Sequence, residues 1–268
     1  MLPLVPSTIR HVSSRQHPLV ARFREVARRP GDTMLLDGSH LLAEALASGV
    51  LVEVAAFQRE ALERPEISRL SRSRGIVHVV TASDSVVSAI SPTRTPAGVV
   101  AIAQRPGNDP SAAIAGERPM VIVAVDVQDP GNMGALVRSA EAGGATAVIA
   151  TSGSADPFGW KALRGAMGSA FRLPIARVAD ATEAIALVRR VAGLRIAATV
   201  ATEGVVMSEA DLTGKLALVV GSEGAGLPDE VVAVADLRVT IPMAPRVESL
   251  NVAVATALLV YEARRQRG

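Results

Sequence analysis

The chain has 268 residues, of which 49% are apolar and 20% are charged, and its formal net charge is +2. This composition is too apolar for a disordered chain. Since a domain usually has roughly 100–200 residues, the length predicts one large or two modest domains. The absence of cysteine excludes disulfides, thiolate catalysis and cysteine-ligated zinc. No stretch suits a membrane span and Met1–Arg10 has no signal-peptide pattern, so we expect a cytoplasmic protein without a membrane partner.

The elements predicted up to residue 104 alternate between helices and short strands. We expect helices over 17–28, 39–48, 67–73 and 84–90, and strands over 34–37, 51–57, 76–80 and 98–104. The next segment, 104–119, is rich in Pro, Gly, Asn, Asp and Ser, which is typical of a linker. We therefore predict a small α/β domain over 1–106 and a second domain over 117–268.

Beyond the linker, continuous apolar runs alternate with helical patterns, which is typical of buried parallel strands in an α/β domain. We expect strands over 120–126, 147–150, 195–200, 216–220 and 237–241, and helices over 132–142, 160–167, 181–191 and 250–265. The last helix is apolar nearly all round, which predicts that it is buried, in part in a subunit interface.

The charge is distributed unevenly along the chain. Residues 1–116 carry a net charge of +3 and residues 117–268 a net charge of −1. Near the start, six arginines face a single acidic residue, Glu25. The planar guanidinium group suits phosphate, so nucleic-acid binding is one interpretation of this stretch, but charge alone favours the alternative of a solvated helix face in an arginine-rich sequence. The six candidate RNA-binding residues are Arg10, Arg15, Arg22, Arg24, Arg28 and Arg29.

Three loops follow predicted buried strands, which is where open α/β sheets bind ligands. The first loop, 126–138, reads DVQDPGNMGALVR and places Asn132 where it can cap a helix, with Arg138 in the second turn. The second loop, 221–228, reads GSEGAGLP, and its glycine spacing differs from the GxGxxG of dinucleotide-binding folds. Its acidic residue, Glu223, is a candidate hydrogen-bond acceptor for a cofactor or a substrate.

The third loop, 241–251, reads IPMAPRVESLN and leads into the last helix. Ser249 or Asn251 can cap that helix. All four histidines precede the linker, and no cluster of His, Cys and Asp suggests a metal site. We therefore expect no metal.

Together and in this order, the three loops resemble the SpoU (TrmH-like) family of the SPOUT methyltransferase superfamily. The segment 168–174, GSAFRLP, and the closing residues 261–266 also fit this family. The N-terminal half resembles the ribosomal-protein-like RNA-binding domain of rRNA-modifying members, on the residues 35–45, LLDGSHLLAEA, and 96–102, PAGVVAI.

The resemblance implies an α/β protein in which a small RNA-binding domain precedes a parallel-sheet catalytic domain with a deep trefoil knot. It implies a homodimer with active sites at the interface and no DNA partner. The implied activity is transfer of a methyl group from S-adenosyl-L-methionine to a ribose 2′-hydroxyl in RNA. The N-terminal domain favours rRNA over tRNA.

The resemblance also implies the site residues. The cofactor would be bound by Thr199, Val200, Gly221, Glu223, Gly224, Ile241, Met243, Ser249 and Leu250. The catalytic set would be Asn132, Arg138, Glu223, Ser249 and Asn251. A guanidinium group does not lose its proton in proteins, so we expect Arg138 to bind phosphate and stabilise the forming alkoxide, while phosphate or Glu223 takes the proton.

Three other functions compete with this prediction. The first is an RNA-binding assembly factor of the same fold without catalytic activity, which the intact loops disfavour. The second is a nucleotide-dependent enzyme of the Rossmann type, which the glycine spacing disfavours. The third is methylation of a base instead of a ribose, which Asn132 and 249–251 disfavour by resemblance alone.

Overall fold

The structure is a computed structural model that describes residues 7–29, 31–107, 109, 111–191 and 193–268, with only the backbone of residues 7–9, 112 and 113. It divides into two compact units, one of residues 1–106 and 158–171 and one of residues 107–157 and 172–268. Residues 1–6, which belong to the segment where no signal peptide is expected, lie outside the described residues. No helix among the described residues is long and apolar enough to cross a membrane.

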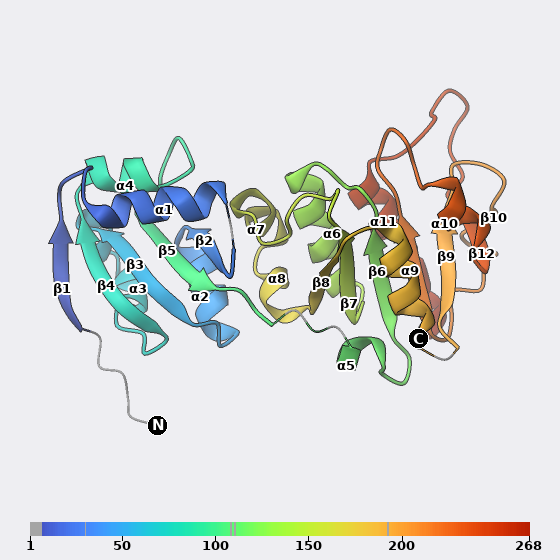
Figure 1. Cartoon of the computed structure of the whole chain (residues 1–268), viewed down its shortest axis with the longest axis horizontal. Coiled ribbons are helices and arrows are strands. Elements are labelled where there is room, and N and C mark those ends of the chain that lie inside the picture. The colour runs from blue at the N-terminus through green and yellow to red at the C-terminus, as the bar shows by residue number, and fades with distance from the viewer. Residues whose placement is uncertain (1–6, 30, 108, 110, 192) are drawn as a thin grey trace. The chain divides into compact units, whose positions relative to one another are not determined.

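The N-terminal unit is built on a five-stranded sheet in the order β1-β4-β3-β5-β2 (Figure 1). The strands β1, β4 and β3 are parallel, whereas β5 pairs antiparallel with both β3 and β2. All but one of these strands were predicted within three residues at each end; the edge strand β1 was not. The strands are β1 (Ser7–Val12), β2 (Thr33–Asp37), β3 (Val52–Gln58), β4 (Ile76–Ala82) and β5 (Val99–Gln104).

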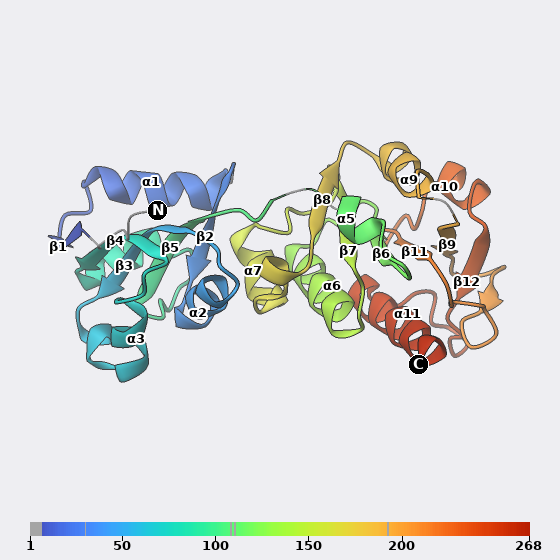
Figure 2. The same cartoon turned by 90° about the horizontal axis from the view of Figure 1, so that it is seen from below.

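Helices cover both faces of this sheet. The helix α1 (Pro18–Arg28) packs beside α4 (Asp84–Ile90) on one face, where Phe23 and Ile102 are among the fully buried residues. The helices α2 (Ser39–Ala47) and α3 (Pro65–Leu70) lie on the opposite face (Figure 2), with the short 3₁₀ helix η1 (Glu60–Glu63) before α3. The apolar spacing of α1 therefore fixes which side carries its arginines.

A segment from the second half of the sequence belongs to this N-terminal unit. It contains α7 (Trp160–Ala166) and most of α8 (Ser169–Arg172). Trp160 packs against the N-terminal core, and the Arg105 guanidinium carbon lies 5.2 Å from the centre of the Phe158 ring. We had predicted the helix over 160–167, but its docking on the N-terminal core is tertiary and has no local sequence signal.

The second unit is built on a seven-stranded, wholly parallel sheet in the order β10-β12-β9-β11-β6-β7-β8. Fully buried runs such as VIVA in β6 and VIA in β7 explain the continuous apolar pattern of the sequence. The two short strands β8 and β10 were not predicted. The strands are β6 (Met120–Ala124), β7 (Ala147–Thr151), β8 (Ile175–Val178), β9 (Arg195–Thr199), β10 (Val205–Val206), β11 (Leu216–Val220) and β12 (Leu237–Thr240).

Two pairs of helices cover this sheet. The helices α9 (Ala181–Arg189) and α10 (Asp229–Ala233) lie on one face, together with α5 (Ser111–Ile114), a turn of helix inside the predicted linker. The helices α6 (Pro130–Ala142) and α11 (Val252–Arg267) pack against each other on the other face. The order of strands and helices agrees with the predicted α/β class, and the trefoil knot itself stays a prediction.

The helix α11 is buried on one side only in the single chain. Its inner face is buried through residues such as Leu259 and Val260, but Val254, Leu258 and Tyr261 are 49%, 40% and 51% exposed. These three positions, spaced by four and three residues, form one stripe, which we call the outer apolar stripe of α11. The expectation that part of the helix is buried in a subunit interface stays a prediction.

Polar contacts hold the C-terminal end of α11. Glu262 accepts hydrogen bonds from Arg265 and Gln266, and these bonds lower the pKa of the Glu262 carboxyl to about 2. The amide of Gln266 also accepts a bond from the Leu212 N–H and donates one to the Ala210 carbonyl. The far end of α11 is therefore tied to the segment before β11.

We predict that Gly143→Ala destabilises the second unit. Gly143 ends α6, and a Cβ placed there would overlap the side chain of Val260 on α11. Forcing extra atoms into a packed interface costs about 1–3 kcal/mol in the free energy of unfolding, measured here by urea titration with circular dichroism. Gly31→Ala is the control, because no atom lies within 4 Å of its added Cβ. An equal effect of the two substitutions would contradict the prediction.

Candidate active site

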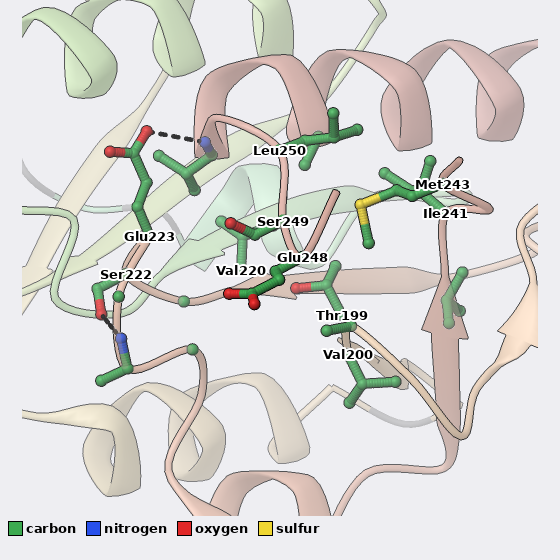
Figure 3. A pocket seen from close by; sticks show the side chains of 18 residues that line it. Thr199, Val200, Val220, Ser222, Glu223, Ile241, Met243, Glu248, Ser249 and Leu250 are labelled. Atoms are coloured by element: carbon green, nitrogen blue, oxygen red, sulfur yellow. Dashed lines mark hydrogen bonds between the residues drawn. The ribbon is translucent and has the colours of Figure 1, made fainter. Parts of the chain in front are cut away.

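A cavity of about 350 Å³ lies at the carboxyl ends of β9, β11 and β12 (Figure 3). Its volume lies within the range of about 300–1,000 Å³ that is typical of small-molecule sites. All nine residues that the sequence analysis assigned to cofactor binding line it: Thr199, Val200, Gly221, Glu223, Gly224, Ile241, Met243, Ser249 and Leu250. Their grouping in one cavity is a property of the fold, and their role in binding stays a prediction.

The floor of the cavity is the loop after β11, which folds back on itself. The N–H of Gly226 donates to the carbonyl of Ser222, and the N–H of Ala225 donates to the Ser222 hydroxyl. A Cβ on Gly221 would overlap the Gly226 carbonyl, so only glycine permits this closure. Gly221 is therefore required by the loop itself, whereas Gly224 is open.

Beside the cavity, one carboxylate oxygen joins the three loops. Glu223 Oε1 accepts hydrogen bonds from Asn132 Nδ2 at 2.9 Å, from Asn251 Nδ2 at 2.6 Å and from the Val252 N–H at 3.2 Å. Asn251 Nδ2 also donates to Asn132 Oδ1 at 3.0 Å. Figure 3 shows Glu223 turned toward the first turn of α11. We call Asn132, Glu223 and Asn251 the amide–carboxylate network.

Helix caps place two members of this network. Asn251 caps α11, because its Oδ1 accepts from the N–H groups of Ala253 and Val254. Asp129, not Asn132 as we had expected, caps α6: its Oδ1 accepts from the Asn132 N–H at 2.8 Å. Because the cap is supplied by Asp129, the side-chain amide of Asn132 is left for Glu223.

The structure does not bring the other two predicted catalytic residues into the network. Arg138 is exposed on α6, and within the described part of the chain its guanidinium makes no hydrogen bond or ion pair. Ser249 lines the cavity and is exposed. The network therefore holds three of the five predicted residues, and Arg138 remains available to a group from outside this chain.

The charge of the cavity limits what can bind there. Its lining contains the two carboxylates of Glu223 and Glu248 and no lysine, arginine or histidine. A phosphate group is normally bound by cations or by N–H groups at a helix start, so this lining favours a ligand with positive charge and no phosphate. Among the described residues, no group of three or more His, Cys, Asp or Glu can hold a metal ion.

Sequence reasoning missed several residues that line the cavity. Ala201 and Val239 lie at or next to the ends of β9 and β12, and Ala255 lies on the first turns of α11. Small apolar residues of this kind carry no chemical signal of their own. The one available signal was that these residues lie near predicted strand ends. That signal applies equally to their neighbours in the sequence, so it does not single them out.

We predict that the hydrogen bonds from Asn251 to Glu223 and Asn132 stabilise the fold in addition to the helix cap that Asn251 provides. Asn251→Ala removes the cap and both donated bonds, and should cost about 1–2 kcal/mol in the free energy of unfolding. Asn251→Asp keeps a capping oxygen but sets a carboxylate against Glu223, so it should also destabilise at pH 7. Parent-like melting of Asn251→Asp at pH 7 would rule the network out.

Comparison with known proteins agrees with this geometry. Residues 119–261 match the SpoU rRNA Methylase family, and residues 9–116 match the Thiostrepton-resistance methylase, N terminus family. The chain is 34% identical over 237 residues to the 23S rRNA (guanosine(2553)-2′-O)-methyltransferase RlmP of Bacillus subtilis (strain 168), covering 88% of this chain and 90% of that protein.

Two solved structures are similar over nearly the whole chain. An rRNA methyltransferase from Sinorhizobium meliloti with bound AdoMet has a TM-score of 0.84 and 30% identity, covering 96% of this chain and 98% of that one. The SpoU methyltransferase AviRb from Streptomyces viridochromogenes, in complex with AdoMet, has a TM-score of 0.85 and 26% identity, covering 94% and 98%. The three ordered loops, the parallel sheet that aligns them and these similarities show that the chain belongs to the SpoU rRNA methylase family.

Proposed function

We propose that this protein transfers a methyl group from S-adenosyl-L-methionine to a ribose 2′-hydroxyl in rRNA. The observation that carries the proposal is a cavity lined by two carboxylates and no cation, directly beside the amide–carboxylate network. The relatives that are named 23S rRNA 2′-O-methyltransferases, and the related structures with AdoMet bound, support the reaction and the donor. Its place of action would be the cytoplasm, where rRNA is accessible.

The cavity fits the chemistry of this donor. S-adenosyl-L-methionine supplies an electrophilic methyl group on a positively charged sulfonium, and it carries no phosphate. Glu223 and Glu248 give the cavity negative charge, while Val220, Ile241 and Leu250 give it apolar walls for an adenine ring. Hydrogen bonds from the backbone of the folded loop after β11 would select the adenine without a basic residue.

The amide–carboxylate network, Arg138 and Ser249 would act on the ribose. Glu223 Oε1 is occupied by three donors, and its second oxygen accepts no hydrogen bond from the described residues, so that oxygen is open to a hydroxyl. Arg138 would bind a phosphate next to the target nucleotide and stabilise the forming alkoxide. Since a guanidinium stays protonated, the proton would pass to phosphate or to Glu223. Asn132, Ser249 and Asn251 would orient these groups.

The N-terminal unit would bind the RNA, and the domain limits 1–106 and 117–268 remain our proposal. The six predicted arginines differ in their surroundings. Arg22 pairs with Glu53, and Arg24 donates to the Ala89 carbonyl at 2.9 Å. Arg24, Arg28 and Arg29 border a surface hollow along α1 together with Glu25, and no side-chain partner from the described residues is seen for Arg28 or Arg29. Among these four, Arg28 and Arg29 are therefore the better placed for phosphate.

We also propose that the protein is a homodimer through its catalytic domain. The outer apolar stripe of α11 is exposed in the single chain, and exposed contiguous apolar residues often mark an interface. The occupant would be a second copy of α11, because a two-fold interface uses the same surface twice.

The dimer is tested by Leu258→Arg, which sets like charges opposite each other across a two-fold axis. We expect the parent protein to sediment as a dimer and the variant as a folded monomer, because Leu258 is 40% exposed in the single chain and the substitution need not disturb the core of the protomer. Val234→Arg is the control, because Val234 is 49% exposed and lies outside α11. A monomeric parent protein, or an intact dimer in Leu258→Arg, would disprove the proposed interface.

The activity is tested by labelled methyl transfer from S-adenosyl-L-methionine to total rRNA and tRNA from a strain without this gene. We expect one 2′-O-methyl mark in rRNA, located by mapping the modified nucleotide. Binding of the donor without transfer to either RNA would favour the alternative, an RNA-binding assembly factor without catalytic activity. A methylated base would overturn the ribose assignment.

Arg138→Lys tests the proposed role of the guanidinium. Lysine keeps the charge but cannot form two parallel bonds to phosphate and alkoxide, so kcat should fall by roughly 100-fold. The affinity for S-adenosyl-L-methionine, measured by calorimetry, should not change, because Arg138 does not line the cavity. Near-parent kcat in Arg138→Lys would mean that charge alone is sufficient.

A further inference from the structure

Two hydroxyl groups at the end of β7 hold the loop that leads into α6. Thr151 and Ser154 are 1% and 5% exposed, which is unusual for polar residues in this apolar core. Thr151 Oγ1 accepts from the Asp126 N–H at 3.0 Å and donates to Asp126 Oδ1 at 2.9 Å. Ser154 Oγ accepts from the Val127 N–H at 3.0 Å and donates to the Ala124 carbonyl at 3.1 Å.

These bonds fix an unusual turn in the backbone. Asp126 has a φ of 53°, a left-handed conformation that is uncommon for residues other than glycine. The neighbouring Gly153 leaves room for its carboxylate, because a Cβ on Gly153 would overlap Asp126 Oδ1. A second bond on Val127, from the Ala155 N–H to its carbonyl, closes the arrangement. The surrounding contacts therefore determine a conformation that the loop would not adopt alone.

The turn determines where α6 begins. The chain leaves β6 at Ala124, turns at Asp126, and reaches the α6 cap at Asp129 three residues later. Asp129 then places Asn132, whose amide bonds to Glu223 at 2.9 Å. With so few residues between the turn and the cap, a change of direction at Asp126 moves the amide of Asn132. A misplacement of about 1 Å near a reacting group can lower a rate by about 100-fold.

We propose that Thr151 and Ser154 are positioning residues for the methyl transfer, which act through Asp126 and Asn132 and do not touch the substrate. The inference rests on the proposed function, because it assigns these hydroxyls to the same site. It predicts that substitution of either hydroxyl lowers kcat by more than its loss of stability would explain.

The chain offers a matched control at the opposite ends of the same two strands. Thr146 precedes β7, and its hydroxyl donates to the carbonyl of Met120 at the start of β6, at 3.2 Å. Thr146→Val and Thr151→Val therefore make the same substitution and both break a hydroxyl contact between β6 and β7. The two substitutions disturb opposite ends of the sheet. The candidate site lies at the end where Thr151 is located.

The test compares steady-state methyl transfer to rRNA, donor affinity and melting temperature in these variants. We expect Thr151→Val to lower kcat by roughly 10–100-fold, with an unchanged KM for S-adenosyl-L-methionine and a melting temperature close to that of Thr146→Val. Thr151→Ser, which restores the hydroxyl, should recover most of kcat. Ser154→Ala should lower kcat in the same way, and it carries the test if Thr151→Val does not fold.

The outcomes separate this inference from the proposed function. No transfer by the parent protein would overturn both. Transfer by the parent protein with equal kcat in Thr151→Val and Thr146→Val would overturn the positioning role alone. A loss in Thr151→Val that Thr151→Ser does not recover would overturn it too, because the methyl group, not the hydroxyl, would then be the feature required.

Discussion

The hydrogen bonds to Glu223 Oε1 are the interaction on which the rest of the site depends. They join Asn132 at the start of α6 to Asn251 and Val252 at the start of α11, residues that lie 119 or more positions apart. A neutral acceptor would serve three donors poorly, whereas a carboxylate makes stronger, charge-assisted bonds. The same side chain borders the cavity, so the element that fixes the loops also supplies charge to the ligand site.

This arrangement constrains the chemistry of Glu223. Its Oε1 already receives three hydrogen bonds, so a proton taken there would displace at least one of them and loosen the starts of α6 and α11. A proton taken at the second oxygen would leave the network intact but reduce the charge that holds it. Under the proposed mechanism, a proton passed to Glu223 would therefore have to go to its second oxygen, which leaves the three hydrogen bonds to Oε1 in place.

Much of this site was predictable, for reasons that differ between residues. The loops after β6 and β11 follow buried strands, and parallel strands bring such loops to one edge, so their meeting was predictable from the order of the strands, whereas the cofactor residues were expected only from the resemblance to the family. The docking of Trp160 on the N-terminal core and the exposure of Leu258 could not be predicted, because both depend on which surface meets which. The Thr151 contact was missed because a lone threonine at a strand end is common and becomes informative only beside the left-handed Asp126.

Arg138 points away from the network within the single chain. At about 100° per residue, the six residues from Asn132 to Arg138 turn the helix so that their side chains point about 120° apart. Asn132 is directed to Glu223, so Arg138 is directed elsewhere, and the described residues give it no partner. The outer apolar stripe lies on α11, the helix that packs against α6, and it is exposed as well. Under the proposed function, Arg138 would bind a phosphate and the stripe would bind a second copy of the chain, so α6 and α11 would link assembly of the protein to recognition of its RNA.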